Sequence, residues 1–149
     1  MQTNLLVLGT AIVCGIALIA GAVLYAQPDA EPAQATEQQP ATRAMNPSQF
    51  AGALAAPERM LIDIRTPEEF AEGHLKGATN IDFYQEDFPA RIAALDRDAP
   101  YAIYCRSGNR TGQTAALMRS LGFTDVVELE HGILAWEAEG RATCTDSVC

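Results

Sequence analysis

At residues 101–110 the chain reads YAIYCRSGNR, which predicts a buried strand, a short loop that begins at Cys105 and the start of a helix. Four aromatic and aliphatic residues in a row suit a strand covered on both faces. Gly108 lets the loop turn without a Cβ clash, and apolar residues at helical spacing follow over 110–121 before Gly122. In open α/β sheets ligands bind beyond the carboxyl ends of the strands, so we expect a site at this loop.

Signals for strands and helices alternate on both sides of that stretch. In chain order we expect a helix that begins at 46–48 and ends at Pro57, a strand at 60–64, a helix from 66, a segment leading through 78–83, a helix at 87–95, a strand at 126–129 and a helix around 134–136. This order predicts one α/β domain over 46–141 with a central, mostly parallel sheet flanked by helices.

The first 26 residues differ from this domain. No charged residue occurs from Leu5 to Ala26, and the apolar run is about as long as a bilayer-spanning helix. We therefore expect one N-terminal hydrophobic helix over 1–26, acting as a transmembrane anchor or a signal segment. The first Lys or Arg is Arg43, which favours an uncleaved anchor over a signal peptide, although LYA before Gln27 leaves cleavage open.

Residues 27–45 are rich in Pro, Ala, Gln and Glu, which predicts a disordered linker. The charges that follow the apolar segment are acidic, so the positive-inside rule gives no reason to keep the domain in the cytoplasm. We expect an extracytoplasmic location, periplasmic in a Gram-negative cell, with the membrane as a partner. A formal net charge of -9 argues against a nucleic-acid partner.

The loop chemistry points to a reactive cysteine. Successive amides in a strand-to-helix turn and the helix N-terminus stabilise an anion, and a thiolate at Cys105 is such an anion. Arg106 and Arg110 add positive charge. The alternative is an inert, buried cysteine at a strand end, but two arginines and a glycine in the loop favour a nucleophile.

Several ordered motifs give the chain a resemblance to a known family. They are DIR at 63–65, EF at 69–70, GHLKGA at 73–78, NI at 80–81, the Cys105 loop and GILAW at 132–136. Together they resemble the rhodanese-like domain, in which a loop cysteine takes sulfane sulfur from a donor such as thiosulfate, holds it as a persulfide and passes it to a thiol or cyanide acceptor. This implies a sulfurtransferase that needs no cofactor.

The resemblance also implies roles for single residues. Cys105 is expected to be catalytic, and the binding loop would consist of Arg106, Ser107, Gly108, Asn109 and Arg110. Phosphatase-like relatives separate their Cys and Arg by five residues, whereas four separate Cys105 from Arg110, and the smaller loop suits sulfur. The rival from another class is a non-enzymatic rhodanese-like binding module, which has no need of an intact reactive thiol.

Residues outside the loop have weaker signals. Asp63 and Arg65 are expected to support the site from behind, with Asp63 satisfying loop amides. His74 is expected to make a structural hydrogen bond, and His131 stands where the family pattern often has Gly. The two histidines lie apart from any close cysteine pair, so no metal site is expected.

The tail at 142–149 contains Cys144 and Cys149, which lie outside the family pattern. In an oxidising compartment we expect a disulfide that closes the tail. A second hypothesis is that one of these cysteines accepts sulfur from Cys105 or forms a disulfide with it.

Overall fold

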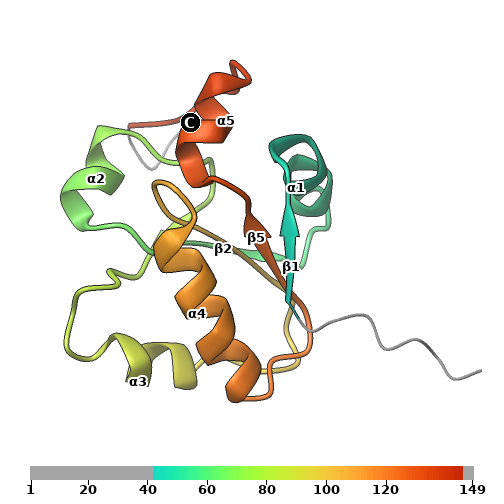
Figure 1. Ribbon diagram of the computed structural model, residues 1–149, viewed down its shortest axis with the longest axis vertical. Helices are drawn as coiled ribbons and strands as arrows, with labels where there is room; N and C mark the ends of the chain where they lie inside the picture. Colours follow the sequence, from blue (N-terminus) through green and yellow to red (C-terminus); the bar gives the residue numbers. More distant parts are fainter. Residues whose placement is uncertain (1–41, 146–149) are drawn as a thin grey trace, which may run out of the picture. The chain divides into compact units, whose positions relative to one another are not determined.

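The computed structural model describes residues 42–145, which form a five-stranded parallel sheet with helices on both faces (Figure 1). The sheet order is β1-β5-β4-β2-β3. The strands are β1 (Thr42–Met45), β2 (Met60–Asp63), β3 (Thr79–Asn80), β4 (Tyr101–Tyr104) and β5 (Val126–Leu129). The helices are α1 (Pro47–Leu54), α2 (Pro67–Glu72), α3 (Phe88–Ala93), α4 (Asn109–Ser120) and α5 (Gly132–Ala138). The predicted α/β class with a central parallel sheet is confirmed.

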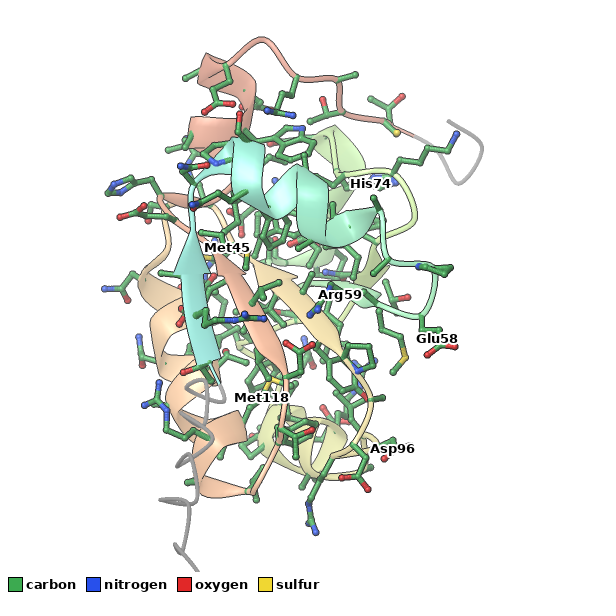
Figure 2. All side chains as sticks on the ribbon, turned by 90° about the vertical axis from the view of Figure 1, so that its right-hand side faces the viewer. Met45, Glu58, Arg59, His74, Asp96 and Met118 are labelled. Atoms are coloured by element: carbon green, nitrogen blue, oxygen red, sulfur yellow. The ribbon has the colours of Figure 1, made fainter. Side chains whose placement is uncertain are left out.

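Alternating strand residues divide the core into two layers. On one face Ile62, Ile103 and Val126 pack with Met118 of α4 and the residues of α3, and on the other Leu61 and its neighbours pack with α1 and α5. Figure 2 labels one methionine of each layer, Met118 and Met45. Both sheet faces are covered, which explains why the central strands β2 and β4 read as largely apolar runs.

The register between β2 and the central strand β4 makes these two strands end at the same height in the sheet. Asp63 of β2 pairs with Tyr104 of β4, and the Ile64 amide donates to the Tyr104 carbonyl at 3.0 Å. The loops that follow β2 and β4 therefore leave the sheet side by side. This register brings the residues around Asp63 next to the loop that begins at Cys105.

The predicted linker is wrong in its last four residues. Thr42–Met45 form β1, which pairs in parallel with β5 from Thr42↔Val126 to Met45↔Leu129. This edge strand is short, and three of its four residues are small or polar (Thr42, Arg43 and Ala44), so its sequence has no apolar run to reveal it. β1 forms because the edge of β5 supplies backbone hydrogen-bond partners, and the sequence of β1 gives no sign of this pairing.

Two helices start at reciprocal caps that the sequence displays. The Asn46 side chain accepts from the Gln49 amide at 2.9 Å, and the Gln49 side chain accepts from the Asn46 amide. Thr66 and Glu69 form the same capping box at the start of α2. Each box satisfies amide groups that a helix end leaves without partners.

The start of the tail folds back onto the domain. His74 and Cys144 form an antiparallel bridge, with both amide-to-carbonyl distances at 2.8 Å. The Trp136 indole donates to the Ala142 carbonyl at 3.1 Å. Cys144 is disulfide-bonded whereas Cys105 is a free thiol, so a disulfide between these two cysteines is not formed.

No helix among residues 42–145 is long and apolar enough to cross a membrane. The expected hydrophobic helix at 1–26, the linker up to residue 41 and Cys149 lie outside the described residues.

Candidate active site

Cys105 is the first residue after the central strand β4. Its side chain is buried, with 1% of the residue exposed, and its Sγ accepts a hydrogen bond from the Gly108 amide at 3.1 Å. Gly108 has a φ of 93°, a value that favours glycine, and α4 begins at the next residue. The loop therefore wraps its backbone around the sulfur.

The amides of this loop form a cluster of hydrogen-bond donors. Those of Arg106, Ser107, Asn109 and Arg110 donate to no other residue in the described part of the chain. The first amides of α4 have no intrahelical acceptor, as in any helix, and they add the positive end of the helix dipole. A concavity of this kind stabilises an anion next to Sγ.

The first turn of α5 holds the loop from behind. The Ile133 amide donates to the Cys105 carbonyl at 2.8 Å, and the Leu134 amide donates to the Arg106 carbonyl at 3.2 Å. In a trans peptide the N–H points away from the C=O. Since α5 binds these two carbonyls, the amides of Arg106 and Ser107 are directed to the opposite side.

Gly132 permits this close approach. Its φ is 63°, and a Cβ at this position would lie 2.3 Å from the Cys105 carbonyl oxygen. His131, which precedes it, has a φ of 58° and an exposed side chain whose Nε2 lies 3.8 Å from Glu130. His131 therefore contributes its backbone to the support of the loop, because its amide lies under Gly108.

The two loop arginines have different surroundings. Arg110 donates from both terminal nitrogens to Glu69, at 2.7 and 2.9 Å, and its guanidinium lies 5.5 Å from the centre of the Tyr84 ring. The hydrogen bond to Glu69 raises the pKa of Arg110. The Arg110 guanidinium therefore holds α2 against the loop, and its assignment to donor binding stays a prediction.

Arg106 is exposed and has no ion pair within residues 42–145. Its neighbour Ser107 is also exposed, and the Asn109 side chain accepts from Gln113 at 2.9 Å. Among the arginines of the loop, Arg106 is therefore the one whose charge is available to an incoming anion.

Asp63 and Arg65 form a buried pair behind the loop. Arg65 Nη2 lies 2.6 Å from the Asp63 carboxylate, which also accepts from the Arg65 amide at 2.9 Å. Nη2 donates in addition to the Gly73 carbonyl at 2.5 Å. His74 lies next along the chain, where its ring stacks on Phe70 and Nδ1 is 3.0 Å from the Phe70 carbonyl. These contacts fix the segment that faces the Cys105 loop.

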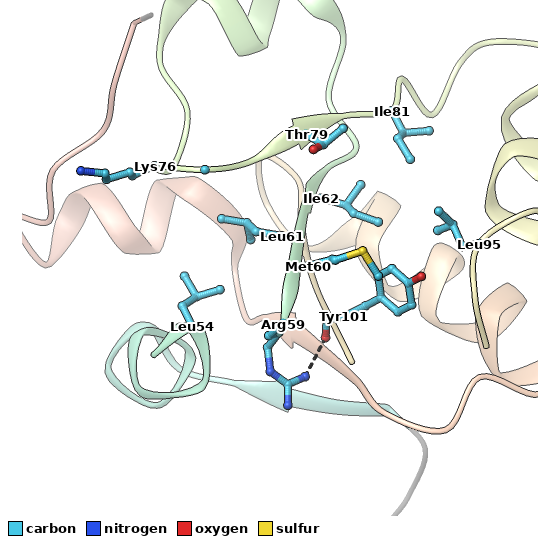
Figure 3. Close-up of a pocket in the computed structure, with 11 residues that line it drawn as sticks. Leu54, Arg59, Met60, Leu61, Ile62, Lys76, Thr79, Ile81, Leu95 and Tyr101 are labelled. Atoms are coloured by element: carbon cyan, nitrogen blue, oxygen red, sulfur yellow. Dashed lines mark hydrogen bonds between the residues drawn. The ribbon is translucent and has the colours of Figure 1, made fainter. Parts of the chain in front are cut away.

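Two hollows differ in their relation to the loop. The larger one, of about 410 Å³, lies between the end of α1 and the edge of β2, where Arg59 donates to the Tyr101 carbonyl (Figure 3). It contains no residue of the Cys105 loop. A smaller, polar hollow of about 250 Å³ is lined by Arg106, Arg65 and the start of α5. No group of three or more potential metal ligands occurs within residues 42–145.

The comparisons with known proteins agree with this geometry. The family profile of the rhodanese-like domain matches residues 46–139. A sulfurtransferase of Allochromatium vinosum is 37% identical over 81 residues, which cover 54% of this chain and 74% of that protein. The thiosulfate sulfurtransferase GlpE of Pseudomonas aeruginosa is 40% identical over 79 residues, covering 52% of this chain and 69% of that protein.

A solved structure gives the same result for the fold. A rhodanese-related protein of Thermoplasma volcanium superposes with a TM-score of 0.62 at 26% identity, covering 70% of this chain and 99% of that one. The chain belongs to the family of rhodanese-like domains. At the level of the family, the named relatives support a rhodanese-type sulfurtransferase.

Sequence reasoning missed three residues that shape the site. Glu69 is part of a motif that the sequence displays, but nothing local reveals that it binds Arg110 across 41 positions. Tyr84 lies in a connecting segment without a periodic pattern. Gly132 is recognisable as part of a motif, whereas its contact with the Cys105 peptide depends on the packing of α5.

Gly132→Ala is expected to destabilise the domain by about 3 kcal/mol. The new Cβ collides with backbone, and the alanine has to adopt a positive φ. Gly140→Ala is the matched control, since its φ is 71° and the space around it is open. That control isolates the backbone cost, expected to be about 1 kcal/mol. Urea unfolding followed by circular dichroism measures both, and equal losses would contradict the proposed close packing.

Glu69→Gln is expected to lower the free energy of unfolding at neutral pH by about 1 kcal/mol, because the ion pair with Arg110 is lost while Gln preserves the capping box. The hydrogen bond from Arg110 lowers the pKa of Glu69 below its ordinary value of 4.5. The wild-type advantage is therefore present above that value and disappears as the pH falls through the lowered pKa.

Unfolding measured over a series of pH values tests this dependence. Glu68→Gln is the control, because it makes the same charge change on the same helix at an exposed residue without an ion pair among the described residues. A difference in the free energy of unfolding between the wild type and Glu69→Gln that stays constant into acid would contradict the assignment.

Proposed function

We propose that the protein is a sulfurtransferase that takes sulfane sulfur from an anionic donor such as thiosulfate, holds it as a persulfide on Cys105 and passes it to a thiophilic acceptor. The observation that carries this proposal is the position of the Cys105 Sγ beneath a loop whose amides have no other acceptor in the described part. Such a loop stabilises both the attacking thiolate and the resulting persulfide anion.

The first step conserves atoms and electrons. The Cys105 thiolate attacks the outer sulfur of thiosulfate and forms a new S–S bond. The bond between the two donor sulfurs breaks, and its electron pair leaves with sulfite. Arg106 attracts the dianion and stabilises the departing sulfite, because its charge is not neutralised by an ion pair within residues 42–145.

The loop size favours sulfur over phosphate. Four residues separate Cys105 from Arg110, and the guanidinium that would complete a phosphate site in the phosphatase-like relatives is bound to Glu69. A binding module without activity is the second candidate. The enzyme is favoured because Cys105 is a free thiol whose sulfur accepts a hydrogen bond from a loop amide.

Cys105→Ser is expected to reduce thiosulfate:cyanide sulfurtransfer by a factor of about a thousand or more, because a serine hydroxyl does not form a persulfide. Thiocyanate formation measures the activity, and mass spectrometry of the thiosulfate-treated protein measures the sulfur added to Cys105. Turnover that survives the substitution, or persulfide on another cysteine only, would overturn the assignment.

We propose further that the domain works outside the cytoplasm, held to the membrane by residues 5–26. The absence of charge over that stretch and the acidic residues after it support this arrangement. The full-length protein is expected in washed membranes, and external protease is expected to degrade the domain in spheroplasts. Recovery of the intact domain from protease-treated spheroplasts would contradict the location.

A further inference from the structure

The side chain of Arg110 begins next to the backbone that holds the Cys105 sulfur. Gly108, whose amide donates to Sγ at 3.1 Å, directly precedes α4, and Arg110 is the second residue of that helix. The pKa of Arg110 is raised first by its hydrogen bond to Glu69 and, to a smaller extent, by the charge of Cys105. The guanidinium therefore lies within electrostatic range of the nucleophile.

The fork of this guanidinium is bound to Glu69. One terminal nitrogen of Arg110 lies 2.7 Å from one carboxylate oxygen, and the other lies 2.9 Å from the second oxygen. A guanidinium uses the same paired geometry to bind two oxygens of a phosphate group. The Glu69 carboxylate thus occupies the two N–H groups that an oxyanion beside the loop would use.

Contacts on both sides keep this ion pair in place. The Glu69 oxygen that binds Arg110 at 2.7 Å also accepts from the Thr66 amide at 3.2 Å, in the capping box of α2, which lies beside the loop (Figure 1). The Tyr84 ring lies 5.5 Å from the guanidinium. The side chains of the pair are only 12% and 22% exposed. A ligand that drew Arg110 away would leave a partly buried carboxylate without its cation, which is costly.

The ion pair also changes the charge that the site offers to an anion. Glu69 neutralises Arg110, so the loop amides and the exposed Arg106 remain as the groups that attract an anion. A dianionic oxyanion such as sulfate or phosphate lacks the fork and meets the negative charge of Glu69. Thiosulfate carries an oxyanion head of the same kind, whereas a sulfur chain without such a head does not.

We propose that Glu69 is a specificity-determining residue that keeps the Cys105 loop from binding dianionic oxyanions through Arg110. Glu69 acts through another side chain, so it is a positioning residue. The inference rests on the proposed function and refines its substrate class. The preferred donor carries sulfane sulfur at the end of a chain with at most one charge, as an organic hydropersulfide does, and thiosulfate binds more weakly than the loop would otherwise allow.

Sulfur transfer from such a donor is balanced. The Cys105 thiolate attacks the outer sulfur of the hydropersulfide R–S–S–H and forms a new S–S bond. The bond between the two donor sulfurs breaks, and its electron pair leaves with the thiolate R–S⁻. The outer sulfur keeps its proton until solvent removes it, and R–S⁻ takes a proton from solvent. No external oxidant or reductant is required.

Protection of Cys105 from alkylation tests the proposal without any sulfur transfer. The full-length protein is treated with iodoacetamide, a neutral reagent, at increasing sulfate and constant ionic strength, and mass spectrometry follows the alkylation of Cys105. In Glu69→Gln, sulfate is expected to protect at about a five-fold lower concentration than in the wild type, because the fork of Arg110 becomes available. Gln preserves the capping box, so α2 keeps its start.

Two control variants separate the fork from a general change of charge. Glu68→Gln removes the same charge from an exposed residue of the same helix and is expected to leave sulfate protection unchanged. Glu69→Gln/Arg110→Lys has the same net charge as Glu69→Gln but lacks the fork. It is expected to lose most of the five-fold gain, because an ammonium group does not replace a guanidinium at a paired site.

Steady-state sulfur transfer to cyanide measures the same selectivity on donors. In Glu69→Gln the KM for thiosulfate is expected to fall about five-fold, while kcat changes less than about two-fold. The KM for methyl hydropersulfide is expected to change less than about two-fold, because this donor has no oxyanion head. Structural damage would raise KM or lower kcat, so a gain in affinity confined to thiosulfate separates specificity from loss of structure.

No gain of sulfate protection in Glu69→Gln, or a gain that Glu69→Gln/Arg110→Lys retains in full, would overturn the role of Glu69. An equal fall in KM for both donors would overturn it as well. These results leave sulfur uptake by the wild type untouched. A wild-type protein that takes up no sulfur from either donor would instead overturn the proposed function, and sulfate protection would still report on Glu69.

Discussion

The orientation of the Cys105 loop depends on two hydrogen bonds from the first turn of α5. They bind the carbonyls of Cys105 and Arg106, so the loop amides are directed toward the sulfur. The contact requires backbone to touch backbone at Gly132, where no side chain fits. A helix from the end of the domain thus determines what the end of its central strand can bind.

Charges around the loop are mostly neutralised by partners that also connect elements. Glu69 connects α2 to α4 through Arg110, and Asp63 holds Arg65 against the segment at Gly73. Neutral pairs of this kind cost less in desolvation than isolated charges would. Arg106 remains as an exposed cation in the loop, so the positive charge available to an anion is concentrated beside Cys105.

The strands and helices with strong local signals could be predicted from the sequence. Apolar runs at 60–64 and 101–104 correspond to β2 and β4, and the caps at Asn46 and Thr66 mark helix starts that the structure contains. β1 could not be predicted, because its pairing with β5 gives it a structure that TRAM alone does not favour. The buried face of α4 could not be predicted either, because two of its residues, Thr111 and Thr114, are polar.

By itself the sequence determined the order of elements after β1, the family and the position of Cys105 at the end of a strand, because apolar periodicity, glycines and motifs are local properties of the chain. The tertiary structure alone decided which arginine is available to a ligand. Arg106 and Arg110 look equivalent in the sequence, but Glu69 approaches only Arg110 once α2 packs beside the loop. A side chain's charge is available only where no distant partner binds it, and such partners come together only when the sheet and helices assemble.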